Sequence, residues 1–306
     1  MRPGHTHARP GCALAVGGLD PGGGAGLAAD LRAFAAAGAF GCAAVALVTV
    51  QSASGLRSAR AVPARELRAQ VLEVMAHQRV RAVKVGALGS RENVLAVAAL
   101  LAESAGVPVV VDTPMIATRT LAREGAARAN GGGARATGGG ARTTEGASRA
   151  SGGARLLDAG ALAALRDRLL PRATLVTVNA DEAEALVGGP VRTVGEAHDA
   201  ARALVKKGAR AALVKGGHLA GASAVDVLAV GGEVFELRAK RLAGGPVHGT
   251  GCTFASLVAG RLATRRAAGE PGAEAIVAAV RWAKRVHHAA LAGAVDVGGE
   301  MRAIVF

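Results

Sequence analysis

Short apolar runs alternate with helical patterns along most of the chain. The runs consist almost entirely of Val, Leu and Ala, which is typical of strands buried on both faces of a parallel sheet. They are Ala13–Val16, Ala43–Val50, Ala82–Val85, Val107–Val111, Leu175–Val178 and Ala211–Val214. Between them apolar residues recur at helical spacing, as Leu27, Leu31 and Phe34 do. This alternation predicts an α/β protein, a three-layer α/β/α sandwich with a mostly parallel central sheet.

The last third of the chain departs from this alternation. Two apolar runs, Ala224–Val230 and Glu233–Leu237, are separated only by a Gly-Gly pair, which predicts a hairpin. Helical patterns follow over Thr253–Ala263 and Ala273–Leu291.

One long segment shows neither the apolar runs of strands nor the apolar spacing of helices. Residues 119–153 repeat Gly, Ala, Arg and Thr, a composition that buries too little apolar surface to offset the entropy of ordering. We expect a disordered basic loop there and a disordered tail over residues 1–12. The strand before the loop and the helix after it continue one alternation, so residues 13–306 are expected to form a single domain that the loop interrupts.

The formal net charge of +14 raises the question of nucleic-acid binding. About half of this excess lies in residues 1–12 and 119–155, largely the segments expected to be unfolded. Basic segments attract nucleic acid electrostatically, but stacking aromatics are scarce, with five Phe, one Trp and no Tyr. We therefore interpret the charge as a solubilising surface and expect no nucleic-acid partner.

The chain also lacks the marks of a membrane or secreted protein. Its longest apolar runs are far shorter than the roughly 20 residues of a membrane span, and residues 1–11 contain no apolar core of a signal peptide. Cys12, Cys42 and Cys252 are widely separated and form no Cys-x-x-Cys pair. We expect a soluble cytoplasmic protein without disulfides, a zinc site or a membrane partner.

The segment Pro246–Cys252, which reads Pro-Val-His-Gly-Thr-Gly-Cys, precedes a helical pattern. Gly249 and Gly251 permit a tight turn and the close approach of a ligand. The amides of Thr250, Gly251 and Cys252 would then point out of a helix N-terminus, which attracts anions and lowers the pKa of a thiol. The alternative is a glycine-rich helix start with a buried structural cysteine, and the segment alone does not decide between the two.

The same segment suggests a hydrolase as a further alternative, because His248 and Cys252 resemble a nucleophile pair. No third residue that would orient the histidine is evident, and the glycines between the two favour anion binding.

A second glycine-rich segment, residues 17–26, joins a predicted strand to a predicted helix over Leu27–Ala37. Its spacing does not match the Gly-x-Gly-x-x-Gly fingerprint, and the chain contains no Gly-Lys pair of a P-loop. A protein of this sequence that handles ATP must use another architecture.

Polar residues follow several of the predicted strands, where open α/β sheets place their sites. They are Gln51, Asp112, Asn179 with Glu182 beyond it, and Lys215 with Gly217 beyond it. Each alone fits a helix cap or a solvated strand end. Together they favour a binding site along one edge of the sheet.

These segments resemble, in order, the hydroxymethylpyrimidine/phosphomethylpyrimidine kinases of thiamine biosynthesis, members of the ribokinase-like superfamily. The resemblance extends from about Ala13 to Ala263, apart from the basic loop, and rests on the combination of Lys-Gly-Gly-His at 215–218 with His-Gly-Thr-Gly-Cys at 248–252. Further matching segments are 18–26, 29–32, 49–51, 84–89, 111–115 and 179–186. The resemblance implies ATP-dependent phosphorylation of 4-amino-5-hydroxymethyl-2-methylpyrimidine and of its monophosphate.

Roles for individual residues also follow from the resemblance. It implies that Cys252 is catalytic and that Gly249, Thr250 and Gly251 form the anion hole. It implies that Gly18, Asp20, Asp30, Gln51 and Ala87 bind the pyrimidine. It implies that Asp112, Asn179, Glu182, Lys215 and Gly217 surround Mg–ATP, with Mg²⁺ carried by the nucleotide rather than by a dedicated protein site. We expect a homodimer acting on a small-molecule substrate.

One departure from the family pattern bears on the substrate. Family members carry Met at the position of Ala87, and the smaller side chain would enlarge the pocket. Pyridoxal kinase activity therefore stands as an alternative, and a non-catalytic pyrimidine-binding regulatory protein is a second one.

Overall fold

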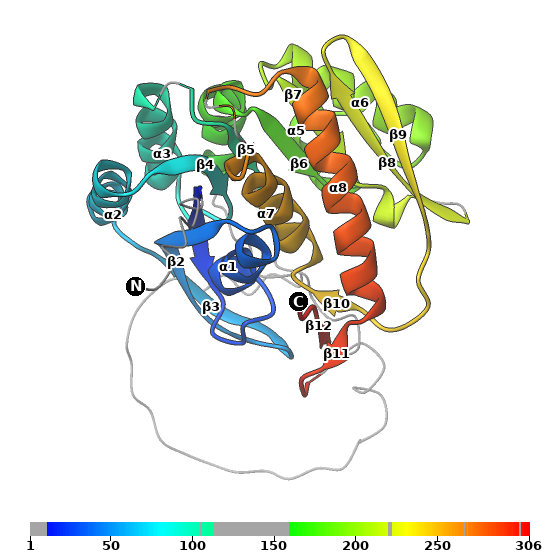
Figure 1. The fold of residues 1–306 in the computed structure, drawn as a ribbon, viewed down its shortest axis with the longest axis horizontal. Coiled ribbons are helices and arrows are strands. Elements are labelled where there is room, and N and C mark those ends of the chain that lie inside the picture. The colour runs from blue at the N-terminus through cyan, green and yellow to red at the C-terminus, as the bar shows by residue number, and fades with distance from the viewer. Residues whose placement is uncertain are drawn as a thin grey trace, which may run out of the picture.

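The computed structural model describes residues 11–104, 106–112, 159–219, 222–265, 267, 269–299 and 301–306. In this part of the chain one nine-stranded sheet has the order β3-β2-β1-β4-β5-β6-β7-β8-β9. The strands from β2 to β7 in this order pair in parallel, whereas β3, β8 and β9 are antiparallel to their neighbours. Helices cover both faces (Figure 1), which confirms the predicted three-layer sandwich.

Every predicted strand overlaps an observed one. The strands of the sheet are β1 Cys12–Leu19, β2 Phe40–Ser52, β3 Gly55–Ala61, β4 Val80–Val85, β5 Val109–Val111, β6 Leu175–Val178, β7 Ala211–Val214, β8 Ser223–Val230 and β9 Glu233–Lys240. The predicted hairpin is confirmed, because β8 pairs with β9 around Gly231 and Gly232, which have φ of 61° and 85°. Only glycine adopts such angles readily.

Each face of the sheet has its own core. On one face pack α1 (Gly26–Ala36), α7 (Thr250–Ala263) and α8 (Ala273–Ala292). The other face is covered by α2 Ala64–His77, α3 Arg91–Glu103, α4 Ala159–Ala164 with its turns η3 Leu165–Leu169 and η4 Leu170–Arg172, α5 Ala180–Val187 and α6 Val194–Lys206. Helix α7 is apolar almost all round because it lies between the sheet, α1 and α8.

Helix α7 begins earlier than predicted. It starts at Thr250 rather than at Thr253, because Gly249 adopts a left-handed conformation that ends the preceding strand. Cys252 therefore belongs to the first helical turn.

A small second sheet precedes this helix. Strand β10 (Val247–His248) pairs in parallel with β12 (Arg302–Ala303), which pairs antiparallel with β11 (Val295–Asp296). The Arg302 backbone N–H donates to the Pro246 carbonyl at 3.1 Å, and its guanidinium donates to the Gly245 carbonyl at 3.3 Å. The segment ahead of α7 is thus held by residues more than fifty positions further along the chain.

The two segments expected to be disordered lie outside the described residues, apart from Gly11 and Cys12. Cys12 is the first residue of β1, so the predicted tail of residues 1–12 is too long by one residue. Strands β5 and β6, which flank the predicted loop in sequence, are neighbours in the sheet.

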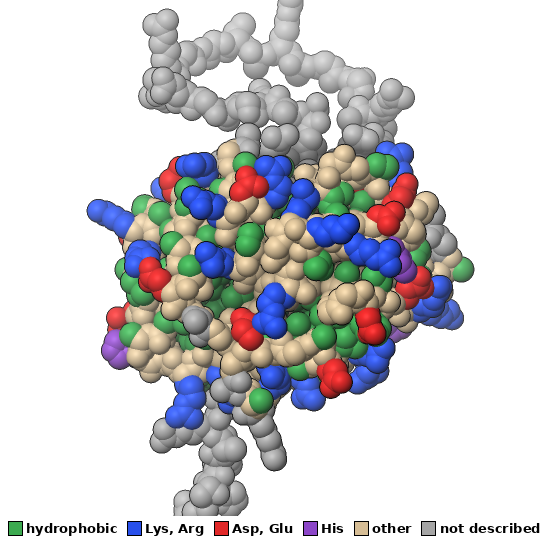
Figure 2. All heavy atoms as spheres, turned by 90° about the horizontal axis from the view of Figure 1, so that it is seen from above, with side chains coloured by type: hydrophobic (Ala, Val, Ile, Leu, Met, Phe, Trp, Pro, Cys, Tyr) green, Lys and Arg blue, Asp and Glu red, His purple; other side chains and the backbone are tan. Residues whose placement is uncertain are grey.

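The surface of the described residues carries mixed charge. On the face shown in Figure 2, Lys and Arg side chains are interspersed with Asp and Glu side chains. None of the helices in the described part of the chain has the length and apolar character that a bilayer crossing requires. Cys12, Cys42 and Cys252 are free.

Candidate active site

The carboxyl ends of the parallel strands meet at one edge of the sheet, and most of the predicted site residues lie there. Asp20 follows β1, Gln51 lies near the end of β2, Ala87 follows β4, Asp112 follows β5, Asn179 follows β6, and Lys215 follows β7; Gly18 is within β1, Glu182 is on α5, and Gly217 is in the one-turn 3-10 helix η5 (Gly216–His218). Asp30 lies on α1, and Gly249–Cys252 form the start of α7.

The start of α7 is shaped by two glycines. Gly249 is the N-cap with φ of 70°, and a Cβ atom there would lie 2.0 Å from the Gly24 carbonyl oxygen. A Cβ on Gly251 would lie 3.0 Å from Nζ of Lys215 and 3.6 Å from Oδ2 of Asp112. Among the described residues no side chain caps this helix, so its first amides are available to an anion beside a lysine and an aspartate.

Asp112 and Lys215 form the polar centre of this region. Lys215 Nζ donates to Asp112 Oδ1 at 2.7 Å, and Thr177 Oγ1 donates to the same oxygen at 2.8 Å. The side chain of Lys215 is 19% exposed and that of Asp112 is 5% exposed. The pair is therefore covered on most sides yet open to a ligand on one.

The beginning of α5 holds Glu182 near this pair. Asn179 accepts from the Glu182 N–H at 2.9 Å, and Glu182 accepts from the Asn179 N–H at 2.8 Å, a capping box. Burial raises the pKa of Glu182 to about 6 against the opposing charge of Lys215, and the charge of Asp112 adds to the rise. Burial also disfavours ionised Asp112, but Lys215 and Lys84 hold its pKa below the usual value.

Asp30 does not contact a ligand site, contrary to the prediction. It is fully buried, its two oxygens accept from Lys84 Nζ at 2.9 and 3.0 Å, and Ser256 donates to it at 2.7 Å. Burial disfavours the Lys84 ammonium, but the Asp30 carboxylate keeps its pKa above the usual value. This ion pair joins α1, β4 and α7 inside the protein and leaves Asp30 no surface for a pyrimidine.

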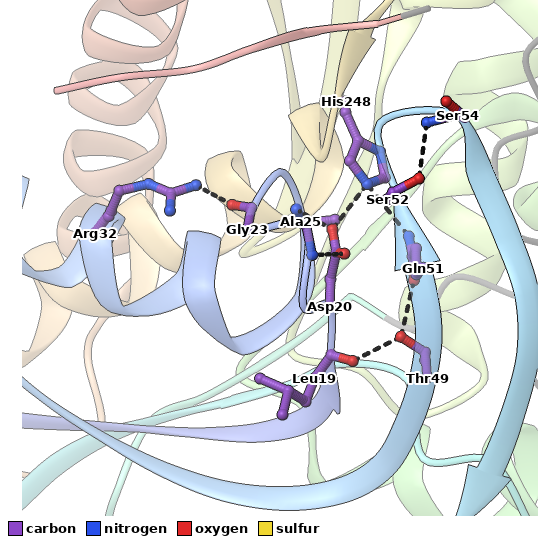
Figure 3. Close-up of polar contacts among 11 residues, drawn as sticks. Leu19, Asp20, Gly23, Ala25, Arg32, Thr49, Gln51, Ser52, Ser54 and His248 are labelled. Carbon is purple, nitrogen blue, oxygen red and sulfur yellow. Dashed lines mark hydrogen bonds and ion pairs between the residues drawn. The ribbon is translucent and has the colours of Figure 1, made fainter. Parts of the chain in front are cut away.

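Asp20 is likewise occupied by the protein itself (Figure 3). Only 3% exposed, it accepts from the backbone N–H groups of Gly22 and Ala25, both at 2.9 Å. His248 Nε2 lies 2.9 Å from Asp20 Oδ2, the oxygen that also accepts from Ala25, and 3.2 Å from Gln51 Nε2. Burial opposes ionisation, yet the bonds from His248 and Ala25 lower the pKa of Asp20. Asp20 thus shapes the glycine loop and ties it to β10, and its predicted contact with the pyrimidine stays a prediction.

The remaining predicted pyrimidine contacts lie close to this loop. Gln51 is half-buried beside His248. Gly18 is buried, and a Cβ on Gly26 would lie 2.3 Å from its carbonyl oxygen, so α1 starts directly over it. Ala87 is 9% exposed, and the neighbouring Gly17 approaches its backbone nitrogen. Gly18, Gln51 and Ala87 therefore keep their predicted role as a proposal.

The pKa of Cys252 differs from what the helix N-terminus alone suggests. The helix N-terminus suggests a lowered value, but burial raises the pKa of this thiol to about 11, and the charges of Asp30 and Asp112 add to the rise. The charge of Lys84 and the Gly26 N–H oppose it without prevailing. This pKa favours the neutral thiol form of Cys252 near pH 7.

Sequence reasoning gave no role to Lys84, Ser256 or Thr177, and it considered His248 only as a nucleophile partner. Lys84 offered a signal, because a lysine within an apolar strand requires a buried partner. Thr177 and Ser256 offered none, since both lie in apolar elements where a hydroxyl is common.

Known structures share this architecture. The pyridoxal kinase of Staphylococcus aureus, solved in complex with AMP-PCP and pyridoxal, matches 97% of this chain and 93% of its own, with a TM-score of 0.77 and 22% sequence identity. The protein therefore has the ribokinase-like fold.

Sequence comparison narrows this class to a family. The phosphomethylpyrimidine kinase family model matches residues 20–127 and 146–304. The hydroxymethylpyrimidine/phosphomethylpyrimidine kinase of Streptomyces coelicolor is 38% identical over 290 residues, 95% of this chain and 92% of that protein. The chain belongs to the phosphomethylpyrimidine kinase family.

A second relative is a longer protein, of which the matching region is only a part. The thiamine biosynthesis bifunctional protein of Geobacter sulfurreducens is 36% identical over 272 residues, which are 89% of this chain and 48% of that protein. This chain spans about half the length of that relative. The predicted family, the kinase activity and its place in thiamine biosynthesis are confirmed, and as a kinase of this family the chain uses ATP on a small-molecule acceptor.

Proposed function

We propose that the protein transfers the γ-phosphoryl group of ATP to the hydroxymethyl group of 4-amino-5-hydroxymethyl-2-methylpyrimidine, and then phosphorylates the resulting monophosphate. The observation that carries this proposal is the position of Gly251, whose Cβ site lies 3.0 Å from Lys215 Nζ and 3.6 Å from Asp112 Oδ2. An uncapped helix start beside a lysine and a carboxylate supplies what phosphoryl transfer needs most, positioning and charge neutralisation.

The charged residues of this edge would hold the nucleotide. The amides of Thr250, Gly251 and Cys252 receive the oxygens of the transferring phosphoryl group, and Lys215 stabilises the charge that develops there. Asp112 and Glu182 supply the carboxylate oxygens that Mg²⁺ prefers, so the residues present fit this ion. Bound Mg²⁺ would neutralise phosphate charge. Among the described residues no group of three or more His, Cys, Asp and Glu is placed to hold a metal without the nucleotide.

The acceptor would lie at the start of α7 beside the glycine loop, against Gly18, Gln51 and Ala87. The Gln51 side chain offers both a donor and an acceptor to a ring that carries both. The neutral thiol of Cys252 would contact the reacting hydroxyl by a hydrogen bond. A strong base is not required, because charge in a loose phosphoryl-transfer transition state gathers on the phosphoryl oxygens.

The test is turnover by the purified protein with Mg²⁺ and ATP, with products identified by mass spectrometry. Conversion of the pyrimidine alcohol to its mono- and diphosphate is expected. Pyridoxal is the comparison substrate, because Ala87 leaves room for a larger ring. A strong preference for pyridoxal would overturn the substrate assignment, and pyrimidine binding without ATP consumption would indicate a regulatory protein instead.

We also propose a homodimer in the cytoplasm. Val48 and Val50 of β2 pair with the edge strand β3 and are 42% and 57% exposed, Phe40 at the start of β2 is 54% exposed, and a second copy would cover them. Light scattering after size-exclusion chromatography tests this, since Val48→Lys together with Val50→Lys should yield a monomer. The three free cysteines fit a reducing compartment.

A further inference from the structure

The turn that follows β7 is fixed by contacts that its own sequence does not reveal. The turn comprises Lys215–Leu219 and contains η5. It is anchored to the sheet where the Lys215 N–H donates to the Val178 carbonyl at 2.7 Å. No atom of the described residues lies within 4 Å of a Cβ placed on Gly217, which follows the lysine by two positions.

Arg241, just after β9, holds the carbonyl side of the turn. Its guanidinium donates to the Gly217 oxygen at 2.7 Å, to the Gly216 oxygen at 3.4 Å, and to the Leu219 oxygen. A planar guanidinium with several N–H donors can serve three acceptors at once, which an ammonium does not do in the same geometry. Carbonyl oxygens that would repel a phosphate are thereby directed at Arg241.

Asp226 and Lys284 hold the amide side of the turn. The Gly216 N–H donates to Asp226 Oδ1 at 2.8 Å, and Lys284 Nζ from α8 donates to Asp226 Oδ2 at 2.6 Å. Asp226 lies on β8 and is 5% exposed. A Cβ on Gly216 would lie 1.9 Å from the Val225 oxygen, so only glycine fits between the strand and the turn.

We infer that Arg241, Asp226 and Lys284 form a clamp of positioning residues for the nucleotide site, which presets the Lys215–Leu219 turn for the phosphates of ATP. The inference rests on the proposed function, which places Lys215 and Gly217 at those phosphates. A turn that is already ordered loses little conformational freedom on binding, so the clamp improves affinity without contacting the ligand.

The experiment compares Arg241→Ala and Arg241→Lys with the matched control Arg238→Ala. Arg238 lies on β9 close to Arg241, is 66% exposed and donates to Glu236, away from the turn. Calorimetric titration with AMP-PCP and Mg²⁺ measures nucleotide affinity, and steady-state kinetics give kcat and the two KM values. Arg241→Ala should weaken AMP-PCP binding and raise the KM for ATP about tenfold, the size of one hydrogen bond to a charged group.

Two further readouts separate positioning from a general effect. The kcat at saturating ATP and the KM for the pyrimidine should change by no more than about twofold, as in Arg238→Ala. Arg241→Lys should show most of the loss although the charge remains. If Arg241→Ala does not fold, Arg241→Lys and Lys284→Met carry the test, and Lys284→Met should also raise the KM for ATP.

The clamp is overturned if the variants bind AMP-PCP as tightly as the unchanged protein. It is also overturned if Arg241→Lys alone is normal, because charge rather than geometry then matters. An unchanged protein that binds AMP-PCP but phosphorylates no pyrimidine would sink the proposed function, while the binding comparison would still decide the clamp. Absence of AMP-PCP binding by the unchanged protein would overturn both.

Discussion

Two lysine–aspartate pairs lie near the start of α7, and they differ in one respect. Lys84 and Asp30 are 1% and 0% exposed, and Ser256 occupies the remaining side of the carboxylate. Lys215 and Asp112 are 19% and 5% exposed, and the Gly251 backbone lies directly against them. The first pair has no room for a ligand and stabilises the fold, whereas the second meets the uncapped helix start. The same chemistry thus serves structure or function according to what covers it.

Lys84→Met should break the inner pair with the largest effect on stability. Removing one partner leaves the Asp30 carboxylate buried without its charge partner, so the free energy of unfolding should fall by about 3–5 kcal/mol. Denaturant unfolding measures this against Lys206→Met on the surface of α6. The double variant Lys84→Met with Asp30→Leu should recover part of the loss. Unchanged stability of Lys84→Met would show that the pair is not structural.

Lys215→Met should affect catalysis rather than stability. Loss of the charge that stabilises the phosphoryl oxygens should lower kcat/KM by about 10²–10³-fold, while the free energy of unfolding changes far less than in Lys84→Met. Lys207→Met, an exposed lysine at the end of α6, is the kinetic control. Turnover near normal in Lys215→Met would contradict the difference between the two pairs.

The charges of both pairs act on the pKa of Cys252. Since the pKa of its thiol is about 11, iodoacetamide should modify it slowly at pH 7 and faster as pH rises toward that value. Cys252→Ala should lower kcat about tenfold to a hundredfold through loss of one hydrogen bond, and Cys252→Ser should lose less. Peptide mapping by mass spectrometry distinguishes Cys252 from Cys12 and Cys42. Rapid modification at pH 7 would mean that the thiol is ionised.

Glu182 gives the outer pair a pH dependence. With a pKa of about 6, its carboxylate is ionised above pH 6 and protonated below it. If the ionised form serves Mg–ATP, kcat/KM for ATP should fall about fivefold between pH 6 and pH 5. Glu182→Gln should have a lower kcat/KM for ATP at pH 7, and this value should not change between pH 6 and pH 5. A profile of the unchanged protein without this acid limb would argue against the role of Glu182.

The fold was largely predictable because its strands are continuous apolar runs and its hairpin is marked by a Gly-Gly pair. Strand β3 was missed, since Gly55–Ala61 is an edge strand with mostly exposed side chains and no apolar alternation. Strands β10–β12 are only two residues long each and carry too little pattern to detect. Edge and short strands depend on a partner that sequence periodicity does not reveal.

The site was predictable where it follows from strand ends and not where it depends on packing. Asp112, Asn179 and Lys215 lie at the expected edge because parallel strands share their direction. The sequence pattern predicts that Asp30 binds the ligand, whereas in the structure its carboxylate pairs with Lys84. These two residues are far apart in the chain, so the sequence does not reveal the contact. The raised pKa of Cys252 could not be predicted for the same reason. The field of the helix is visible in the local sequence, whereas burial and the nearby carboxylates depend on tertiary structure.

The pairing of β10 with β12 joins residues that are far apart in the chain. His248, which secures the glycine loop, is paired with Ala303, and α7 and α8 lie between these two residues in the sequence. The large sheet can close while this corner is still open, because its described strands all end at or before Lys240. Enzyme activity should therefore return later than the bulk of the secondary structure when the denatured protein is allowed to refold.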